Sequence, residues 1–121
     1  MPKLSKAELL DRYFTAYRTQ DRKVIEAGLT EDFTFTSPYD DAIGRATYFE
    51  RCWPNSELFQ TIELEKVFEQ GDEAFARYRV LTKDGREFRN TEFYTFRGDQ
   101  LTSVQVYFGA AYKDGRFVGQ K

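Results

Sequence analysis

The stretch from Arg86 to Gly109 constrains the fold of this chain most, because it reads as two long strands joined by a tight turn at Gly98-Asp99. Side chains of a strand alternate between its two faces. One face of this hairpin then carries Phe88, Asn90, Glu92, Tyr94, Phe96, Thr102, Val104, Val106 and Phe108. Glu92 lies among aromatic and apolar neighbours there. A carboxyl on a buried face is unusual and often functional.

The chain before this hairpin also reads as long strands. Residues Gln60–Phe68 and Glu73–Thr82 alternate apolar and polar side chains, and a turn at Gly71-Asp72 separates them. Asp84-Gly85 is a strong hairpin signal. The sequence therefore predicts four long antiparallel strands. One further Asp-Gly turn follows at Asp114-Gly115.

The N-terminal part reads as an amphipathic helix over residues 5–19. Ser5 and Glu8 form a capping-box pattern, in which each side chain bonds to the other residue's backbone N–H. Apolar side chains then follow helical spacing on one face. They are Leu9, Leu10, Tyr13, Phe14 and Tyr17.

Shorter elements follow between this helix and the strands. Asp21 is placed to cap a second helix that stops at Gly28, a residue that tolerates the left-handed conformation. Residues 33–37 alternate like a strand, with Phe33, Phe35 and Ser37 on one face, and residues 38–43 read as a loop. A third helix begins near Gly44, stops before Pro54, and carries Tyr48, Phe49, Cys52 and Trp53.

This order of elements predicts an α+β fold in a single domain spanning residues 1–121. We expect a cone-shaped, strongly curved antiparallel sheet packed on three N-terminal helices. Helices cannot fill the hollow of such a sheet completely, so a pocket should open between the two layers.

Composition narrows the function. The formal net charge is -2, so the chain lacks the basic character of a nucleic-acid binder. Cys52 is the only cysteine and there is no histidine, which fits a reducing cytoplasm and excludes Ser-His-Asp catalysis and histidine-ligated metals. We expect no cofactor, although Asp40 and Asp41 leave a hard cation as an alternative. No stretch reads as a membrane span or a signal peptide.

The order of elements resembles the nuclear transport factor 2-like superfamily. Within it the chain is similar to SnoaL-like small bacterial proteins and, more distantly, to ketosteroid isomerase. The resemblance spans Leu9 to Phe108, and its most specific pieces are Thr36-Ser37-Pro38, Gly44-Arg45, Arg89-Asn90-Thr91-Glu92 and Val106-Tyr107-Phe108-Gly109. The superfamily includes isomerases, cyclases, dehydratases, hydrolases and proteins that only bind, so the resemblance implies the fold more than the reaction.

The resemblance also implies roles for individual residues. Glu92 matches the protonated carboxylic acid in the oxyanion hole of ketosteroid isomerase, and Tyr13 matches its second donor. Ser37 stands where that enzyme has its aspartate base. A serine hydroxyl does not abstract a carbon-bound proton unaided, so Asp40 is the substitute base we consider.

A wider set of residues is predicted to line the ligand pocket. Besides the catalytic candidates Glu92, Tyr13 and Asp40, it comprises Tyr17, Ser37, Phe49, Trp53, Asn90, Tyr94, Val106 and Phe108. A structural interpretation stands beside this one. The tyrosines are then plain core residues, Asn90 satisfies Glu92, and Glu92 pairs with an arginine such as Arg77, Arg79 or Arg89.

Two functions from different classes follow. The first is a small-molecule protein that holds an apolar, carbonyl-bearing ligand, with isomerase, cyclase or hydratase chemistry or with binding alone. The second is a dimeric scaffold whose pocket is filled. The resemblance implies a homodimer through the outer sheet face, where several aromatic residues are expected among polar ones. That face carries Phe75, Leu81, Phe93, Gln105 and Tyr107, with Arg77, Arg79, Thr91 and Thr95.

Overall fold

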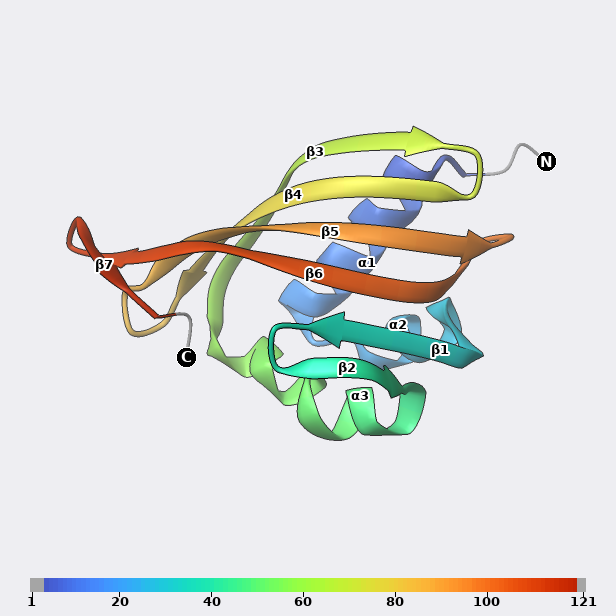
Figure 1. Cartoon of the computed structure of the whole chain (residues 1–121), viewed down its shortest axis with the longest axis horizontal. Helices are drawn as coiled ribbons and strands as arrows, with labels where there is room; N and C mark the ends of the chain where they lie inside the picture. Colours follow the sequence, from blue (N-terminus) through green and yellow to red (C-terminus); the bar gives the residue numbers. More distant parts are fainter. Residues whose placement is uncertain (1–3, 120–121) are drawn as a thin grey trace.

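The computed structural model describes residues 4–119, and Figure 1 shows helices packed against one curved sheet. The predicted α+β class and the curved, unclosed sheet are confirmed. The helices are α1 (Lys6–Thr19), α2 (Arg22–Gly28), α3 (Arg45–Arg51) and the 3-10 helix η1 (Trp53–Leu58). The strands are β1 (Leu29–Ser37), β2 (Asp40–Gly44), β3 (Phe59–Gln70), β4 (Glu73–Thr82), β5 (Glu87–Arg97), β6 (Gln100–Lys113) and β7 (Arg116–Val118).

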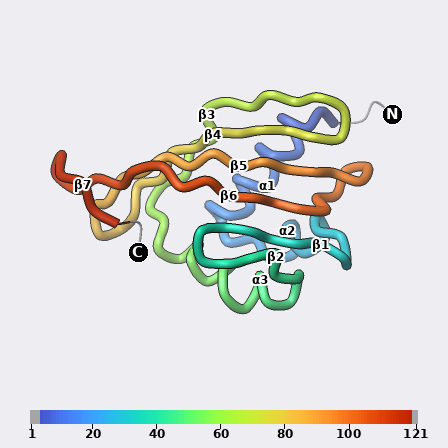
Figure 2. Tube along the Cα trace, viewed as in Figure 1, coloured from blue at the N-terminus to red at the C-terminus, as the bar shows by residue number. Residues whose placement is uncertain are grey.

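The strands follow the order β2-β1-β6-β5-β4-β3, with β7 paired to the far end of β6. β1 runs parallel to β6, and the other pairs are antiparallel. Figure 2 shows β1 beside β6 although the two are far apart in the sequence. α1 lies against the inner, concave face of β3–β6, α2 lies behind β1, and α3 lies below β2 (Figure 1). The core fills the space between the two layers.

Helix α1 begins where its sequence predicts. The Ser5 hydroxyl accepts from the Glu8 backbone N–H at 3.1 Å, and the Ser5 N–H donates to the Glu8 carboxylate at 3.0 Å. This confirms the capping box. The buried residues Leu9, Leu10, Tyr13, Phe14 and Ala16 form the face toward the sheet.

Gly28 ends α2 as predicted, but for a different physical reason. Its φ angle is not in the left-handed region. Instead, a Cβ at this position would lie 2.5 Å from Cε1 of Tyr13, so only glycine leaves room for the ring. The glycine therefore sets how closely α1 and α2 approach.

Two local predictions are wrong. Residues 40–44 form strand β2 rather than a loop, because the turn after Ser37 folds the chain straight back onto β1. The third helix ends at Arg51, so Cys52 and Trp53 lie outside it. The steric restriction that Pro54 places on Trp53 disfavours a continued α-helix, and the chain tightens into η1.

Bulges modify the alternation along the β5–β6 hairpin. The register shifts between Thr95 and Phe96, so Leu101 is buried while Thr102 and Ser103 are less enclosed. Both hydroxyls lie 2.6 Å from Oγ1 of Thr95. Thr102 therefore does not share the inner face with Val104 as strict alternation predicts, and Leu101 takes that place.

Candidate functional site

A cavity of about 220 Å³ lies between the inner face of the sheet and the helices. Most of its wall is apolar or aromatic. Its polar groups lie around Glu92 on β5, around Asp40 at the start of β2, and at Asn55, Thr82 and Arg86. Of the residues predicted from the sequence, the cavity is lined by Tyr13, Tyr17, Ser37, Asp40, Asn90, Glu92, Tyr94, Val106 and Phe108.

Glu92 is held by two tyrosines from neighbouring strands. The Tyr78 hydroxyl donates to Oε2 at 2.7 Å, and the Tyr94 hydroxyl donates to Oε1 at 2.5 Å. Asn90 Nδ2 in turn donates to the Tyr78 oxygen at 3.0 Å. These four side chains form the Glu92 cluster, which lies on the inner face of β4 and β5 because all four share one strand parity.

Burial changes the pKa values of the Glu92 cluster. Surrounding protein atoms remove water from Glu92 and raise its pKa, although the two tyrosine hydrogen bonds oppose the rise. The side chain keeps partial accessibility because it opens onto the cavity. Desolvation, followed by the nearby Glu92 carboxylate, likewise raises the pKa of the Tyr78 and Tyr94 hydroxyls well above 10. Burial thus shifts the titration of all three groups toward higher pH.

The arginines considered as partners of Glu92 lie on the opposite, outer face of the sheet. Arg77 and Arg89 contact Oε1 of Glu65 at 3.2 and 2.9 Å. Arg79 contacts Glu87 at 2.7 Å. Within residues 4–119 no lysine or arginine is paired with Glu92, so the arginine-paired interpretation of this carboxyl is wrong.

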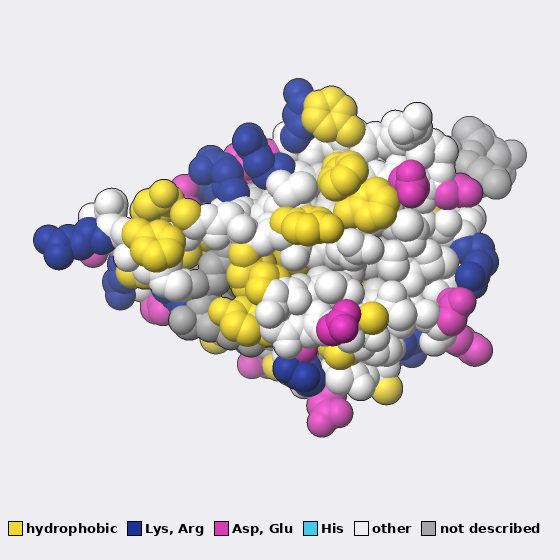
Figure 3. Space-filling view, viewed as in Figure 1, with side chains coloured by type: hydrophobic (Ala, Val, Ile, Leu, Met, Phe, Trp, Pro, Cys, Tyr) yellow, Lys and Arg dark blue, Asp and Glu magenta, His cyan; other side chains and the backbone are white. Residues whose placement is uncertain are grey.

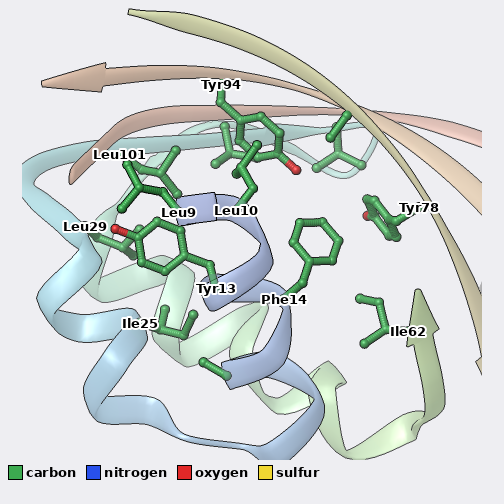
Figure 4. Close-up of a cluster of buried hydrophobic side chains, with 14 of the residues drawn as sticks. Leu9, Leu10, Tyr13, Phe14, Ile25, Leu29, Ile62, Tyr78, Tyr94 and Leu101 are labelled. Atoms are coloured by element: carbon green, nitrogen blue, oxygen red, sulfur yellow. The ribbon is translucent and has the colours of Figure 1, made fainter. Parts of the chain in front are cut away.

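Tyr13 does not join the Glu92 cluster. Its hydroxyl donates to the Asp99 backbone carbonyl at 2.6 Å. Figure 4 shows its ring turned toward Leu29 and away from Tyr78. Tyr17, one helical turn further along α1, is close enough to Glu92 for the carboxylate to raise its pKa, although burial is the larger cause. None of the described residues is hydrogen-bonded to the Tyr17 hydroxyl.

The second polar group surrounds Asp40, which is buried. Its Oδ1 lies 2.8 Å from Nη2 of Arg51, and its Oδ2 accepts from the Ser37 hydroxyl at 3.3 Å. The Cys52 thiol lies 3.8 Å from the same Oδ2. The Arg51 side chain is half exposed, so this group marks the mouth of the cavity. Asp40 thus reaches the cavity from the position that follows Ser37 across a tight turn.

Two predicted pocket residues lie behind the cavity wall. Phe49 is buried and packs between the guanidinium groups of Arg22 and Arg45, whose Cζ atoms lie 4.6 and 5.3 Å from its ring centroid. Trp53 packs against Tyr17, with 5.0 Å between ring centroids. Neither lines the cavity; Trp53 instead supports the ring of Tyr17.

The comparisons with known proteins agree with this fold. Residues 10–104 match the profile of the SnoaL-like domain family. That match covers most of the chain. The chain belongs to the SnoaL-like domain family. None of the curated proteins matches the sequence of this SnoaL-like protein.

Solved structures support the same fold at low sequence identity. A protein from Jannaschia sp. CCS1, assigned as a SnoaL-like polyketide cyclase, has a TM-score of 0.73 at 18% identity, covering 89% of this chain and 91% of its own. A protein from Kribbella flavida assigned as a ketosteroid isomerase has 0.70 at 18% identity, covering 87% and 78%. An NTF2-like protein of unknown function from Cytophaga hutchinsonii has 0.70 at 23% identity, covering 88% and 92%. These likenesses establish the fold alone.

Sequence reasoning missed two members of the site in this SnoaL-like protein. Tyr78 lies opposite Asn90, and this position depends on strand register, which alternation along a single strand does not determine. Arg51 is close to Asp40 only through the packing of α3 on the β1–β2 hairpin. The signal in the sequence that points to Arg51 is its positive charge, which is opposite to that of Asp40.

Neither a metal-binding group nor a membrane-spanning helix is found in the part of the chain that the structure describes. Residues 4–119 contain no group of three histidine, cysteine, aspartate or glutamate side chains arranged to hold a metal. None of the helices there has the length and apolar character needed to cross a membrane. Of the two acids considered for a hard cation, Asp40 is paired with Arg51 and Asp41 is exposed.

Proposed function

We propose that this SnoaL-like protein holds one small apolar ligand in the cavity, with a carbonyl oxygen of the ligand at the Glu92 cluster. The observation that supports this most is an acid with a raised pKa, hydrogen-bonded to two tyrosines, in a wall that is mostly apolar and aromatic. In its protonated form Glu92 donates a hydrogen bond, and an apolar cavity strengthens that bond. Tyr17 supplies the second donor in place of Tyr13, because its hydroxyl is not engaged elsewhere in the described chain.

For catalysis, Asp40 is the proton acceptor at the mouth. Glu92 donates a hydrogen bond to the ligand carbonyl while Asp40 takes a proton from the adjacent carbon, which gives an enol-like intermediate. In a ligand with a β,γ double bond, Asp40 then returns that proton to the γ-carbon, which is an isomerisation. In a ligand with a β-hydroxyl, Asp40 instead gives the proton to that oxygen, which leaves as water, and the reaction is a dehydration. The two environments, a desolvated acid whose pKa is raised and a carboxylate next to Arg51, suit this division of roles.

Binding alone is the second candidate. The ion pair with Arg51 supports it, because that pair already occupies the one carboxylate available as a base. A chain with this pair intact binds the carbonyl ligand and does not move the proton.

The test of the binding step uses two small probes that differ only in the carbonyl, 2-tetralone and tetralin. The wild type should bind 2-tetralone at least tenfold more tightly, measured by calorimetry or by thermal shift. At a hundred times its dissociation constant a ligand stabilises a fold by about 2.7 kcal/mol. Glu92→Leu should remove the preference, while Glu87→Leu on the outer face of the same strand should keep it. Equal affinity for both probes in the wild type would sink the carbonyl proposal.

A separate experiment decides between catalysis and binding. Deuterium exchange at the carbons beside the 2-tetralone carbonyl is followed by NMR, with and without the protein. If Asp40 is the base, the wild type accelerates exchange and Asp40→Asn does not. If the wild type binds the ketone but leaves the exchange rate at its background value, binding alone is the function.

We further propose that the protein acts in a bacterial cytoplasm as a homodimer through its outer sheet face. Figure 3 shows hydrophobic side chains gathered on the sheet face turned away from α1. Phe68, Phe75 and Tyr107 are exposed there, and Phe75 stacks on Phe93 with 4.7 Å between ring centroids. Sedimentation should give a dimer that Phe75→Lys dissociates, whereas Phe117→Lys, at the distant β7, should not. A monomeric wild type would rule the dimer out.

A further inference from the structure

Among the described residues, Glu92 is the carboxylate of the cavity wall that has no cation near it. The other acid of the wall, Asp40, lies 2.8 Å from Arg51. The remaining cation of the wall, Arg86, contacts Asp84 at 3.1 Å. No lysine or arginine contributes to the electrostatic environment of Glu92 among the described residues. An ionised Glu92 therefore leaves one uncompensated negative charge inside an apolar cavity.

The surroundings of Glu92 match what a small organic cation needs. Ammonium groups are bound by a carboxylate together with the faces of aromatic rings. Beside the cluster's own Tyr78 and Tyr94, the wall carries Phe14 and Tyr17, and Phe14 packs edge-on against Tyr78 at 5.0 Å. The Tyr94 hydroxyl uses its proton on Glu92, so its oxygen lone pairs are left to accept from a ligand N–H.

We infer that the Glu92 cluster is also a site for a protonated amine on a compact apolar skeleton, with the ammonium group bound to the Glu92 carboxylate and the skeleton among the aromatic rings. This goes beyond the proposed carbonyl ligand, because it uses the opposite ionisation state of the same carboxyl. A ketone needs the protonated acid as a donor, whereas an amine needs the carboxylate as its counter-ion.

The two ligand classes are thus opposed in their pH dependence. The titratable groups facing Glu92 are Tyr78 on β4, Tyr94 on β5 and Tyr17 on α1, and Cys52 lies near Tyr17. The three tyrosines have pKa values raised above 10 and keep their protons at neutral pH. Any change of charge at the cluster below pH 8 therefore belongs to Glu92. Amine affinity should rise as pH rises through its pKa, and ketone affinity should fall.

The experiment uses 2-aminotetralin, 2-tetralone and tetralin, which share one skeleton. Their affinities for the wild type are measured by calorimetry from pH 5 to pH 8, where an alkylamine stays protonated. We expect 2-aminotetralin to bind at least tenfold more tightly than tetralin at pH 8, with that advantage shrinking toward pH 5. Glu92→Gln should remove the advantage, and Glu87→Gln, an outer-face carboxyl of the same strand, should keep it.

The outcomes separate this inference from the proposed function. Equal binding of 2-aminotetralin and tetralin at every pH overturns the amine site, while 2-tetralone binding measured in parallel still tests the carbonyl proposal. An amine advantage that survives Glu92→Gln also overturns it, because another group would then hold the cation. If Glu92→Gln fails to fold, the slope of amine affinity with pH in the wild type decides: a slope that is flat or falls with pH is against the inference.

Discussion

Two glutamates of strand β5, five residues apart, show how much the face of the sheet changes the environment of a carboxyl. Glu92 faces inward, accepts hydrogen bonds from two tyrosines and has its pKa raised mainly by desolvation. Glu87 faces outward, contacts Arg79 at 2.7 Å and has its pKa lowered mainly by that bond. The residue type and the strand are the same. The face of the sheet decides the sign of the shift, because one face has dense protein around it and the other has water and arginines.

The largest effect on the contrast between Glu92 and Glu87 is expected from disturbing the pairing of β5 with β6, which places Glu92 on the inner face. A Cβ on Gly109 of β6 would clash with the backbone carbonyl of Arg89 on β5. Gly109→Ala should therefore separate the two strands and lower the free energy of unfolding by about 3 kcal/mol. Urea unfolding measures this, with Ala110→Gly as the neighbouring exposed control. A loss below about 0.5 kcal/mol would show that the strands adjust without cost.

A smaller loss should follow from removing one hydroxyl of the Glu92 cluster. Tyr78→Phe takes a hydrogen bond from Glu92 and leaves the Asn90 amide without this acceptor. Removing one partner of a buried hydrogen bond costs about 2 kcal/mol, so the free energy of unfolding at pH 7 should fall by that amount. Tyr107→Phe, on the exposed outer face, is the matched control and should change it little. Equal effects of the two substitutions would remove the distinction between the faces.

The pH dependence of stability sharpens the comparison. Because folding raises the pKa of Glu92 above 4.5, its contribution to stability is complete below that value and is lost as pH rises through the folded-state pKa. The wild type should lose stability relative to Glu92→Gln as pH increases above 4.5, with a slope of at most about 1.4 kcal/mol per pH unit. Urea unfolding of both proteins from pH 4 to pH 8 measures the difference. A difference that does not change with pH would mean that folding leaves the Glu92 pKa where it is.

The smallest effect belongs to Glu87, and its sign is reversed. Arg79 lowers the pKa of Glu87, so the contribution of this carboxylate is present above pH 4.5 and is lost as pH falls. Relative to Glu87→Gln, the wild type should lose stability toward acid, and salt should weaken the difference because the pair is exposed. The same series of urea curves, repeated at low and high salt, measures it. A difference of the same sign as for Glu92 would contradict the comparison.

The sequence was sufficient for features that depend on neighbours along the chain. The capping box, the turns at Gly71, Gly85 and Gly98, and the inward parity of Glu92 all follow from local geometry, and the structure contains each of them. Resemblance to SnoaL-like proteins extended this to the fold and to the cavity. Parity alone was misleading only where a bulge interrupts it, as at Thr102.

Tertiary structure decided which of these residues meet. Strand register brings Tyr78 opposite Asn90, and packing of α3 brings Arg51 to Asp40. The rotation of α1 against the sheet directs the Tyr13 hydroxyl to the Asp99 carbonyl and leaves Tyr17 beside Glu92. Such contacts depend on the packing of whole elements. A shift of one residue in strand register, or a rotation of a helix by a fraction of a turn, changes them all. The sequence by itself thus determined that an acid faces the cavity, and only the packing of sheet on helix determined its partners.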